Sequence, residues 1–500
     1  MRRFAAILAG GRGEPLWPHS RTCLPKQFLS LWDGPTFLQR TYDRIAGMTD
    51  APEVFVLTAE GTLDLVRAQI PGLDPQRLVG EPLARGTAAS AVLAALTAAA
   101  LAGPEAVVAL VPADHAFFGD AGFQDALAAA YATAEREGEV VLIGVPPTRP
   151  EPGYGYIRLG ADLAPCGAAR IASVDGFVEQ PPLARAIECL RSGRYLWNTG
   201  ICACRTDVLL GRLGLHEPGL AQLITGLAGS DPVRADRDEL RRLLQPLRAI
   251  SLDHALLVPV GRAAVVIATL AWDDVGSWDA LSRLQPQDEH GNVQHGRAVL
   301  SATERTVVYN SASQRLVVTH GVEDLVVVDT PDTTLIAARD LLPGLQAALG
   351  AVRASGFQAY LDEAVGLIEP GPQDPATLPA PDQVRTVAKP WGREVWWAHC
   401  EAYAAKRLEV RGGQALSLQY HQRKHETLYV LVGRVRLRLG GEERVVGPGH
   451  VAVISPGTIH RLEALTDAVI FEVSTPDLDD VVRLEDRYGR AAAPPLLTPR

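Results

Sequence analysis

The sequence predicts an α/β domain, then a small β domain, and finally a β-barrel domain. Three observations support this order: apolar strand-like runs alternate with helix-like stretches, short strands follow them, and a proline-rich segment precedes a series of alternating strands. We place the α/β domain at residues 1–285, the small β domain at 286–367, a linker at 368–384 and the barrel domain at 385–500.

The α/β domain is predicted from β-branched runs that alternate with Ala- and Leu-rich stretches. We expect strands at 4–10, 53–59 and 107–114, and helices at 37–45, 63–69 and 88–103. This alternation is typical of βαβ units, which build a mainly parallel sheet. Ligands bind such sheets beyond the carboxyl ends of the strands.

From about residue 290 to 345, short strands are separated by polar turns, with the runs RAVLSA, RTVVYNS, QRLVVTHG, EDLVVVDT and TTLIAA. This texture predicts a small β domain, and a solenoid similar to a left-handed β-helix is one form that it can take. Residues 368–384 then carry five prolines, so neither a helix nor a central strand can persist there.

The C-terminal domain is predicted from alternating strands joined by glycine-rich turns. The runs are AKRLEVR, ALSLQYH, TLYVLVG, VRLRLGG, HVAVISP and AVIFEVS. Such a series is typical of an antiparallel barrel or a jelly roll.

Composition narrows the classes of partner. The 500 residues are 47% apolar and 21% charged, as in ordinary globular chains, and 48 Lys and Arg against 58 Asp and Glu give a net charge of −10. A negative chain repels phosphate backbones and anionic lipid, so we expect neither nucleic acid nor a membrane as a partner. The apolar stretch at 88–103 is shorter than the ~20 residues of a spanning helix.

Two further features predict a cytoplasmic location. The apolar run after Met1-Arg2-Arg3-Phe4 ends at Gly10, which is too short for a signal-peptide core. The six cysteines include no CxxC pair, a usage that indicates free thiols in a reducing compartment.

A glycine-rich loop follows the first predicted strand, with the sequence Leu8-Ala9-Gly10-Gly11-Arg12-Gly13. Without Cβ atoms, the backbone N–H groups of such a loop can cradle a phosphate. The loop departs from GxGxxG because Leu16 stands at the third glycine position, and it lacks GK[ST]. The longer string GGRGEPLWPHSRTCLPKQF at 10–28 is far more specific than the glycines alone.

This string resembles the sugar-phosphate nucleotidylyltransferases, and its Leu-Trp-Pro and Pro-Lys-Gln-Phe pieces are most similar to the mannose-1-phosphate guanylyltransferases. Further pieces follow in the family's order: Gly80-Glu81-Pro82, Arg85-Gly86-Thr87, Pro112-Ala113-Asp114-His115, Gly153-Tyr154-Gly155-Tyr156-Ile157, Phe177-Val178-Glu179-Gln180-Pro181, Trp197-Asn198-Thr199-Gly200 and 272–278, WDDVGSW. The resemblance implies a Rossmann-like, GT-A type nucleotidyltransferase domain. It also implies transfer of GMP from GTP to α-D-mannose 1-phosphate, giving GDP-mannose and pyrophosphate.

The chemistry of this transfer explains the charged residues. A sugar-phosphate oxygen attacks the α-phosphorus while pyrophosphate leaves, so the site needs positioning and charge neutralisation above all. Asp114 and Asp274 can offer hard oxygens to Mg²⁺, which neutralises the reacting phosphates. By resemblance, Lys26 and Arg21 bind phosphates and complete the catalytic set.

Glu81 is a candidate guanine reader, because a carboxylate accepts from both N1–H and the 2-amino group of that base. The alternative is a favourable charge ahead of the next helix. The resemblance implies that Leu8, Ala9, Gly10, Gly11, Gly13, Glu81, Arg85, Thr87 and Pro112 bind the nucleotide, and that Gly155, Glu179 and Asn198 bind the sugar.

Two departures remove a cation near phosphate. Glu14-Pro15 stands where the family usually has an arginine, and Gln180 stands where it usually has a lysine. Each charge-assisted donor of this kind is worth about 2.7–4 kcal/mol if it acts like an oxyanion-hole group. Two alternatives therefore stay open: a monofunctional enzyme with one degenerate domain, and a non-catalytic protein that binds sugar nucleotides.

The C-terminal barrel contains a candidate metal site. Gln419, His421 and Arg423 share one strand face, Glu426 follows them, and His460 lies on a later strand. Gln419, His421, Glu426 and His460 together suit Zn²⁺ or another divalent metal. The alternative is an empty barrel with a structural or dimerisation role.

This half resembles the cupin domain of type II phosphomannose isomerases, which it also matches in Lys389-Pro390-Trp391-Gly392 and in the closing segment 483–490. The resemblance implies conversion of mannose 6-phosphate to fructose 6-phosphate, with Arg490 as a cation near the reacting carbons. The family's histidine cluster is reduced here, because Arg423 and Thr427 stand at positions that are often histidine. The whole chain is similar to the bifunctional isomerase–guanylyltransferases, and a homo-oligomer is left open.

Overall fold

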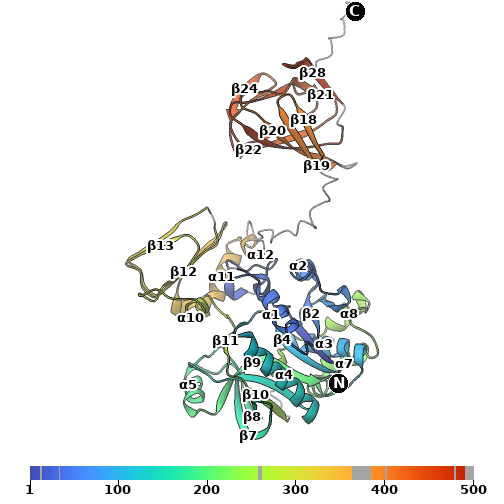
Figure 1. Cartoon of the computed structure of the whole chain (residues 1–500), viewed down its shortest axis with the longest axis vertical. Helices are drawn as coiled ribbons and strands as arrows, with labels where there is room; N and C mark the ends of the chain where they lie inside the picture. Colours follow the sequence, from blue (N-terminus) through green and yellow to red (C-terminus); the bar gives the residue numbers. More distant parts are fainter. Residues whose placement is uncertain are drawn as a thin grey trace, which may run out of the picture. The chain divides into compact units, whose positions relative to one another are not determined.

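The computed structural model describes residues 1–11, 14–32, 34–256, 262–312, 314–362, 385–399, 403–477 and 480–489. The chain forms two compact units, Met1–Glu369 and Pro370–Arg500 (Figure 1). The first unit contains both the predicted α/β domain and the predicted small β domain. The predicted linker at 368–384 lies outside the described residues.

A nine-stranded sheet in the order β3-β2-β1-β4-β9-β6-β10-β8-β7 forms the centre of the first unit. Its strands are β1 (Arg3–Leu8), β2 (Glu53–Ala59), β3 (Leu78–Glu81), β4 (Val107–Pro112), β6 (Val140–Val145), β7 (Tyr156–Cys166), β8 (Ala169–Val178), β9 (Tyr195–Arg205) and β10 (Ala263–Ile267). A separate pair is formed by β5 (Ala116–Phe118) and β11 (Ala271–Asp273).

The sheet is mixed rather than mainly parallel, which corrects the prediction. The strands β1, β2, β3 and β4 pair in parallel, as do β6 and β10. However, β9 lies between β4 and β6 and is antiparallel to both. The reason is that the β7–β8 hairpin and one helix intervene before β9, so the chain re-enters the middle of the sheet in the opposite direction.

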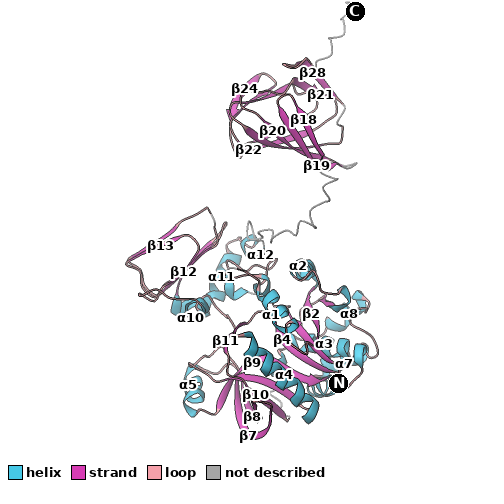
Figure 2. Cartoon of the chain, in the orientation of Figure 1, coloured by secondary structure: helices cyan, strands magenta, loops and turns pink. Residues whose placement is uncertain are grey.

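Helices cover both faces of this sheet (Figure 2). On β1, Ala5 and Ile7 pack into one apolar cluster with residues of α1, α2, α4 and α5, whereas Phe4 and Ala6 pack into the opposite cluster with residues of α3 and α6–α9. The helices are α1 (Phe37–Ala46), α2 (Leu63–Gln69), α3 (Thr87–Ala102), α4 (Asp120–Glu137), α5 (Leu183–Ser192), α6 (Thr206–His216), α7 (Pro218–Gly226), α8 (Arg237–Leu244), α9 (Leu252–Leu256) and α10 (Ala280–Leu284). Short 3-10 helices are η1 (Glu14–Leu16), η2 (Lys26–Phe28), η3 (Glu60–Thr62) and η4 (Pro75–Arg77).

Parallel ladders build the small β region, as expected of a solenoid. The register joins Ala298 to Val317 and Val307 to Val326, so both ladders repeat every 19 residues. The strands are β12 (Val293–His295), β13 (Ala298–Ser301), β14 (Val307–Asn310), β15 (Val317–His320), β16 (Leu325–Asp329) and β17 (Thr334–Ala338). Three helices that the pattern did not predict follow: η5 (Arg339–Gly344), α11 (Leu345–Ala354) and α12 (Ala359–Asp362).

A third apolar cluster joins the small β region to the sheet domain. Trp17 and Trp278 pack there with Tyr309, and the Trp278 indole N–H donates to the Trp17 carbonyl at 2.8 Å. The loop after the first strand is therefore held between both parts of the unit.

The second unit consists of two antiparallel sheets, which corresponds to the jelly-roll form of the predicted architecture. The first has the order β18-β19-β20-β27-β22-β25 and the second β24-β23-β26-β21-β28, and both contribute residues to one core. The strands are β18 (Arg385–Lys389), β19 (Gly392–His399), β20 (Ala404–Val410), β21 (Leu418–His421), β22 (Glu426–Val432), β23 (Val435–Leu439), β24 (Glu442–Val446), β25 (Val451–Ile454), β26 (His460–Ala464), β27 (Ala468–Ser474) and β28 (Val481–Glu485).

Across the described residues of both units, no helix has the length and apolar character needed to cross a membrane. The alanine-rich stretch forms α3, whose residues 88–98 are buried against the sheet and neighbouring helices.

Candidate active site

A cavity of about 420 Å³ opens beyond the carboxyl ends of β1, β3 and β4. This size is typical of small-molecule sites. Eleven of the predicted residues line it: Leu8, Gly10, Gly11, Glu81, Thr87, Pro112, Asp114, Gly155, Glu179, Asn198 and Asp274. Segments that are far apart in the sequence thus meet in one place.

Two glycines let the backbone approach closely around this cavity. Gly86 has a φ of 79°, and a Cβ there would lie 2.2 Å from the Ile250 carbonyl oxygen. A Cβ on Gly155 would lie 2.7 Å from the Phe177 ring and 3.0 Å from Glu179. Side chains at these positions would displace the segments that carry Thr87 and Glu179.

Lys26 lies between the two predicted metal ligands. Its ammonium is 3.0 Å from Asp114 Oδ2 and also donates to the main-chain carbonyl of Asp274. Burial alone would raise the pKa of Asp114, but Lys26 and His115 hold that pKa below its ordinary value. Asp114 is therefore an anion, and with Asp274 it offers the oxygen donors that Mg²⁺ prefers.

Asp273 anchors the loop that carries Asp274. Its carboxylate is 2% exposed and accepts from Arg283 at 2.7 Å, from Arg149 at 3.4 Å and from the Val275 N–H at 2.9 Å. The role of Asp273 could not be predicted from the sequence, because the two arginines that it contacts lie in other segments.

Glu81 stands buried at another wall of the cavity. The side chain is 7% exposed, and within the described structure Oε1 has no hydrogen-bond partner. Burial raises the pKa of Glu81 to about 7, against the effect of the Ser90 hydroxyl. A buried carboxylate oxygen without a partner is costly, so a ligand that donates a hydrogen bond there relieves that cost.

The predicted sugar-binding residues lie beside Asp253, a carboxylate that was not predicted from the sequence. The Asn198 amide donates to Asp253 Oδ1 at 2.8 Å, and Asp253 lines the cavity together with Glu179. Burial, then repulsion from Asp253, raises the pKa of Glu179. Asp253 lies on the short helix α9, outside every motif that the sequence analysis used.

Several predicted residues lie elsewhere. Arg21 is buried and pairs with Asp332 of the small β region at 2.8 Å, so its guanidinium is held away from the cavity lining. Arg85 donates to the main-chain carbonyls of Leu244 and Gln245, both at 3.0 Å. The Ala9 carbonyl accepts a hydrogen bond from the Gln27 amide. Gln27 itself lines the cavity, although it was not predicted to bind the nucleotide. Gly13 and Arg490 lie outside the described residues.

The amino-acid sequence matches those of known proteins over almost its whole length. Residues 4–291 match the family model described as nucleotidyl transferase. The mannose-1-phosphate guanylyltransferase ManC of Salmonella typhimurium is 33% identical over 97% of this chain and 98% of its own length. The chain belongs to the mannose-1-phosphate guanylyltransferase family.

Further relatives and family models match other parts of the chain. The alginate biosynthesis protein AlgA of Pseudomonas aeruginosa is 32% identical over 98% of both chains. A solved structure described as a mannose-1-phosphate geranyltransferase from Thermus thermophilus is 35% identical, with a TM-score of 0.62, and covers 71% of this chain and 100% of its own. Residues 296–341 match a mannose-phosphate isomerase/GMP-like β-helix domain, and residues 380–486 match the C-terminal domain of mannose-6-phosphate isomerase.

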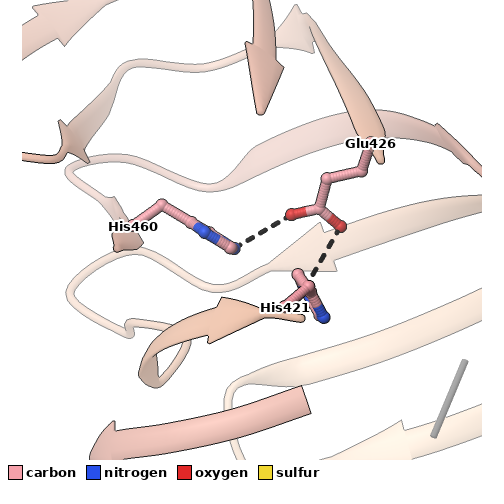
Figure 3. A group of neighbouring side chains, drawn as sticks. All are labelled: His421, Glu426 and His460. Atoms are coloured by element: carbon pink, nitrogen blue, oxygen red, sulfur yellow. Dashed lines mark ion pairs between the residues drawn. The ribbon is translucent and has the colours of Figure 1, made fainter. Parts of the chain in front are cut away.

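A second cluster, in the C-terminal unit, can hold a metal ion. Ligand atoms of His421, Glu426 and His460 lie within 4.8 Å of one another, and all three residues are buried. Figure 3 shows the Glu426 carboxylate between the two imidazoles, with His460 Nε2 at 2.9 Å from Oε1 and His421 Nε2 at 3.7 Å from Oε2. Two nitrogens and a carboxylate suit a borderline divalent metal such as Zn²⁺.

Outer hydrogen bonds orient both imidazoles for this role. His421 Nδ1 faces the Asp480 carboxylate at 3.1 Å, and His460 Nδ1 donates to the Thr458 carbonyl at 2.9 Å. Such partners turn each Nε2 towards the cluster, where it can bind a metal, as in metal-ligating histidines. Burial lowers the pKa of His421, which keeps the imidazole neutral.

Gln419, the fourth predicted ligand, faces the cluster with its amide nitrogen. Its Nε2 lies 3.4 Å from both His421 Nε2 and His460 Nε2, while Oε1 accepts from the Ser417 hydroxyl at 2.7 Å. The amide must turn over before its oxygen can bind a metal.

Proposed function

We propose that the first unit transfers GMP from GTP to α-D-mannose 1-phosphate, forming GDP-mannose and releasing pyrophosphate. The observation that carries this proposal is a single cavity that combines two polar ends. One end holds the buried Glu81 oxygen without a partner in the described structure. The other end holds Asp114 and Asp274, which the buried Lys26 ammonium contacts.

The base is read at Glu81 in this proposal. The ionised carboxylate accepts from N1–H and the 2-amino group of guanine, a donor pair that adenine and uracil do not present. Gly10 and Gly11 line the same cavity, where their backbones can approach the phosphates. This arrangement supports GTP over ATP and UTP.

The reacting phosphates lie beside Lys26, Asp114 and Asp274. The two carboxylates would hold Mg²⁺, which would supply positive charge to neutralise the phosphates. The Lys26 ammonium fixes the Asp114 carboxylate and adds a positive charge at the place where charge develops. Asn198, Asp253 and Glu179 accept or donate hydrogen bonds at the sugar hydroxyls, which orients the attacking sugar phosphate.

Product analysis tests this proposal. The purified full-length chain is incubated with GTP, mannose 1-phosphate and Mg²⁺, and GDP-mannose is identified by chromatography and phosphorus NMR. We expect GDP-mannose and pyrophosphate in equal amounts. Parallel reactions with ATP, UTP or glucose 1-phosphate are controls for the base and the sugar. In this proposal the reaction takes place in the cytoplasm, where GTP is available.

We also propose a second activity, interconversion of mannose 6-phosphate and fructose 6-phosphate by the C-terminal unit. The His421, Glu426 and His460 cluster supports it, together with the match to the isomerase C-terminal domain. These three residues would hold a divalent metal, which would supply a Lewis acid for the substrate oxygens during proton transfer between C1 and C2. A coupled isomerase assay tests it, and H421A is expected to abolish this activity while leaving GDP-mannose synthesis intact.

A further inference from the structure

A buried lysine lies directly behind the metal cluster of the C-terminal unit. The Lys424 ammonium is 2.6 Å from Glu426 Oε2 and 2.6 Å from Glu472 Oε1. Lys424, Glu426 and Glu472 are each 4% exposed. A cation this deeply buried and bonded to two carboxylates is a fixed part of the site rather than a solvated side chain.

The charges alternate beyond Glu472. Its second oxygen, Oε2, is 3.1 Å from the Lys406 ammonium, which also lies 4.9 Å from the centre of the Trp396 ring. The strand register brings these charged side chains together. Glu472 of β27 lies opposite Lys406 of β20 on one side and opposite Leu428 of β22 on the other. Glu426 therefore contacts the Lys424 ammonium, and Glu472 contacts the ammonium groups of both Lys424 and Lys406.

The Glu426 carboxylate is divided between two partners. Oε1 faces His460 Nε2 at 2.9 Å, and Oε2 is in contact with Lys424. Lys424 lies against Glu426 and Lys406 lies against Glu472, so each ammonium offsets the charge of a buried carboxylate. A divalent cation bound to Glu426 would therefore lie close to an ammonium that already contacts one oxygen of the same buried carboxylate, which is unfavourable.

We propose that Lys424 competes with a divalent cation for Glu426 and so lowers the affinity of the His421, Glu426 and His460 cluster for metal. The ion is then held weakly and exchanges with the solution. Lys424 is a positioning residue that acts through Glu426. The inference rests on the metal-binding part of the proposed isomerase function, but its test measures metal binding and not turnover, so the two can fail separately.

Zn²⁺ titration of the metal-free full-length chain, with a chromophoric chelator as competitor, tests this inference. The binding that H421A removes is assigned to the cluster. We expect K424M to tighten this binding by about tenfold or more, since one opposing charge is removed. E472Q is expected to weaken it, because the charge of Lys424 then loses a counter-ion, and K424R keeps the charge and stays within about threefold of the unchanged chain.

Circular dichroism and thermal unfolding of each metal-free variant show whether the fold is retained. Zn²⁺ binding that appears only in K424M supports the inference as strongly as a tenfold gain. Equal or weaker binding by folded K424M overturns it, as does an absence of binding in both chains. If K424M does not fold, E472Q decides, and tighter binding by folded E472Q overturns the inference.

Discussion

The Lys26 ammonium lies 3.0 Å from Asp114 Oδ2 and donates at the same time to the main-chain carbonyl of Asp274. Lys26 belongs to the short helix η2, Asp114 follows β4, and Asp274 follows β11. One buried cation therefore links the Asp114 carboxylate to the backbone of Asp274, the two residues that we propose as Mg²⁺ ligands. The reacting end of the cavity depends on this link.

Removal of the Lys26 charge is expected to slow transfer. In K26M we expect kcat to fall about 10²-fold or more, the loss seen when one preorganised donor is removed from a charge-stabilising site. Pyrophosphate release measures it. R67A is a matched control, since exposed Arg67 pairs only at the surface with Asp64 in the described contacts, and its kcat is expected to stay unchanged. A K26M enzyme with full kcat would contradict the role of Lys26.

Guanine affinity is expected to depend on pH through Glu81. Burial raises the pKa of this carboxyl to about 7, so it ionises near neutrality and accepts guanine donors only above that pH. Below about pH 7, GDP should bind up to tenfold more weakly for each pH unit, as fewer molecules carry the ionised carboxylate. Calorimetry measures this dependence. E81Q should bind weakly at all these pH values, and a pH profile identical in E81Q would assign the titration to another group.

The raised pKa of Glu81 also makes the stability of the folded chain depend on pH. Because the folded pKa of Glu81 lies above the ordinary value of 4.5, the folded chain binds the extra proton between the two values. The contribution of Glu81 to the unfolding free energy therefore falls as pH rises through this window. Denaturant unfolding of E81Q should lose this part of the pH dependence, and no difference from the unchanged chain would contradict the shift.

Asp253 is expected to control sugar binding. D253N keeps the shape but removes the charge that orients the Asn198 amide at 2.8 Å. We expect KM for mannose 1-phosphate to rise about tenfold with a smaller change in KM for GTP, consistent with loss of a charged hydrogen bond. D162N, at an exposed position on β7, is the control. An equal rise in both KM values would indicate a general disturbance of the cavity.

Arg21 is expected to act on stability. Its buried ion pair with Asp332 joins the loop after β1 to the small β region, so R21M removes the cation that neutralises that carboxylate. We expect the unfolding free energy to fall by about 3–5 kcal/mol. Urea unfolding measures the loss. A stable R21M with weakened GTP binding would instead restore the phosphate-binding role that the resemblance implies.

The core strands were predictable because their apolar pattern is local. Phe4 and Ala6 face one layer of helices while Ala5 and Ile7 face the other, so the run reads as a strand buried on both sides. The direction of β9 was not predictable, since nothing in residues 195–205 encodes which strands it enters between. The helices α11 and α12 also escaped notice, because the contacts that stabilise them are distant in sequence.

The site was predictable where short motifs carry it. Asp114, Glu81 and Asn198 stand in segments with a recognisable order, and the fold brings them to one cavity. Asp253 and Lys424 could not be found in this way. Asp253 lies on a helix without a motif, and the run Arg423-Lys424-His425 reads as a solvated basic turn although Lys424 is buried.

The most direct test of the central claim is pyrophosphate release by the purified full-length chain with GTP, mannose 1-phosphate and Mg²⁺. ATP, UTP and glucose 1-phosphate serve as parallel substrates. We predict rapid release that requires both GTP and mannose 1-phosphate, which would show that the cavity transfers GMP despite Pro15 and Gln180. GTP binding without any release would contradict the account and identify the first unit as a sugar-nucleotide-binding domain.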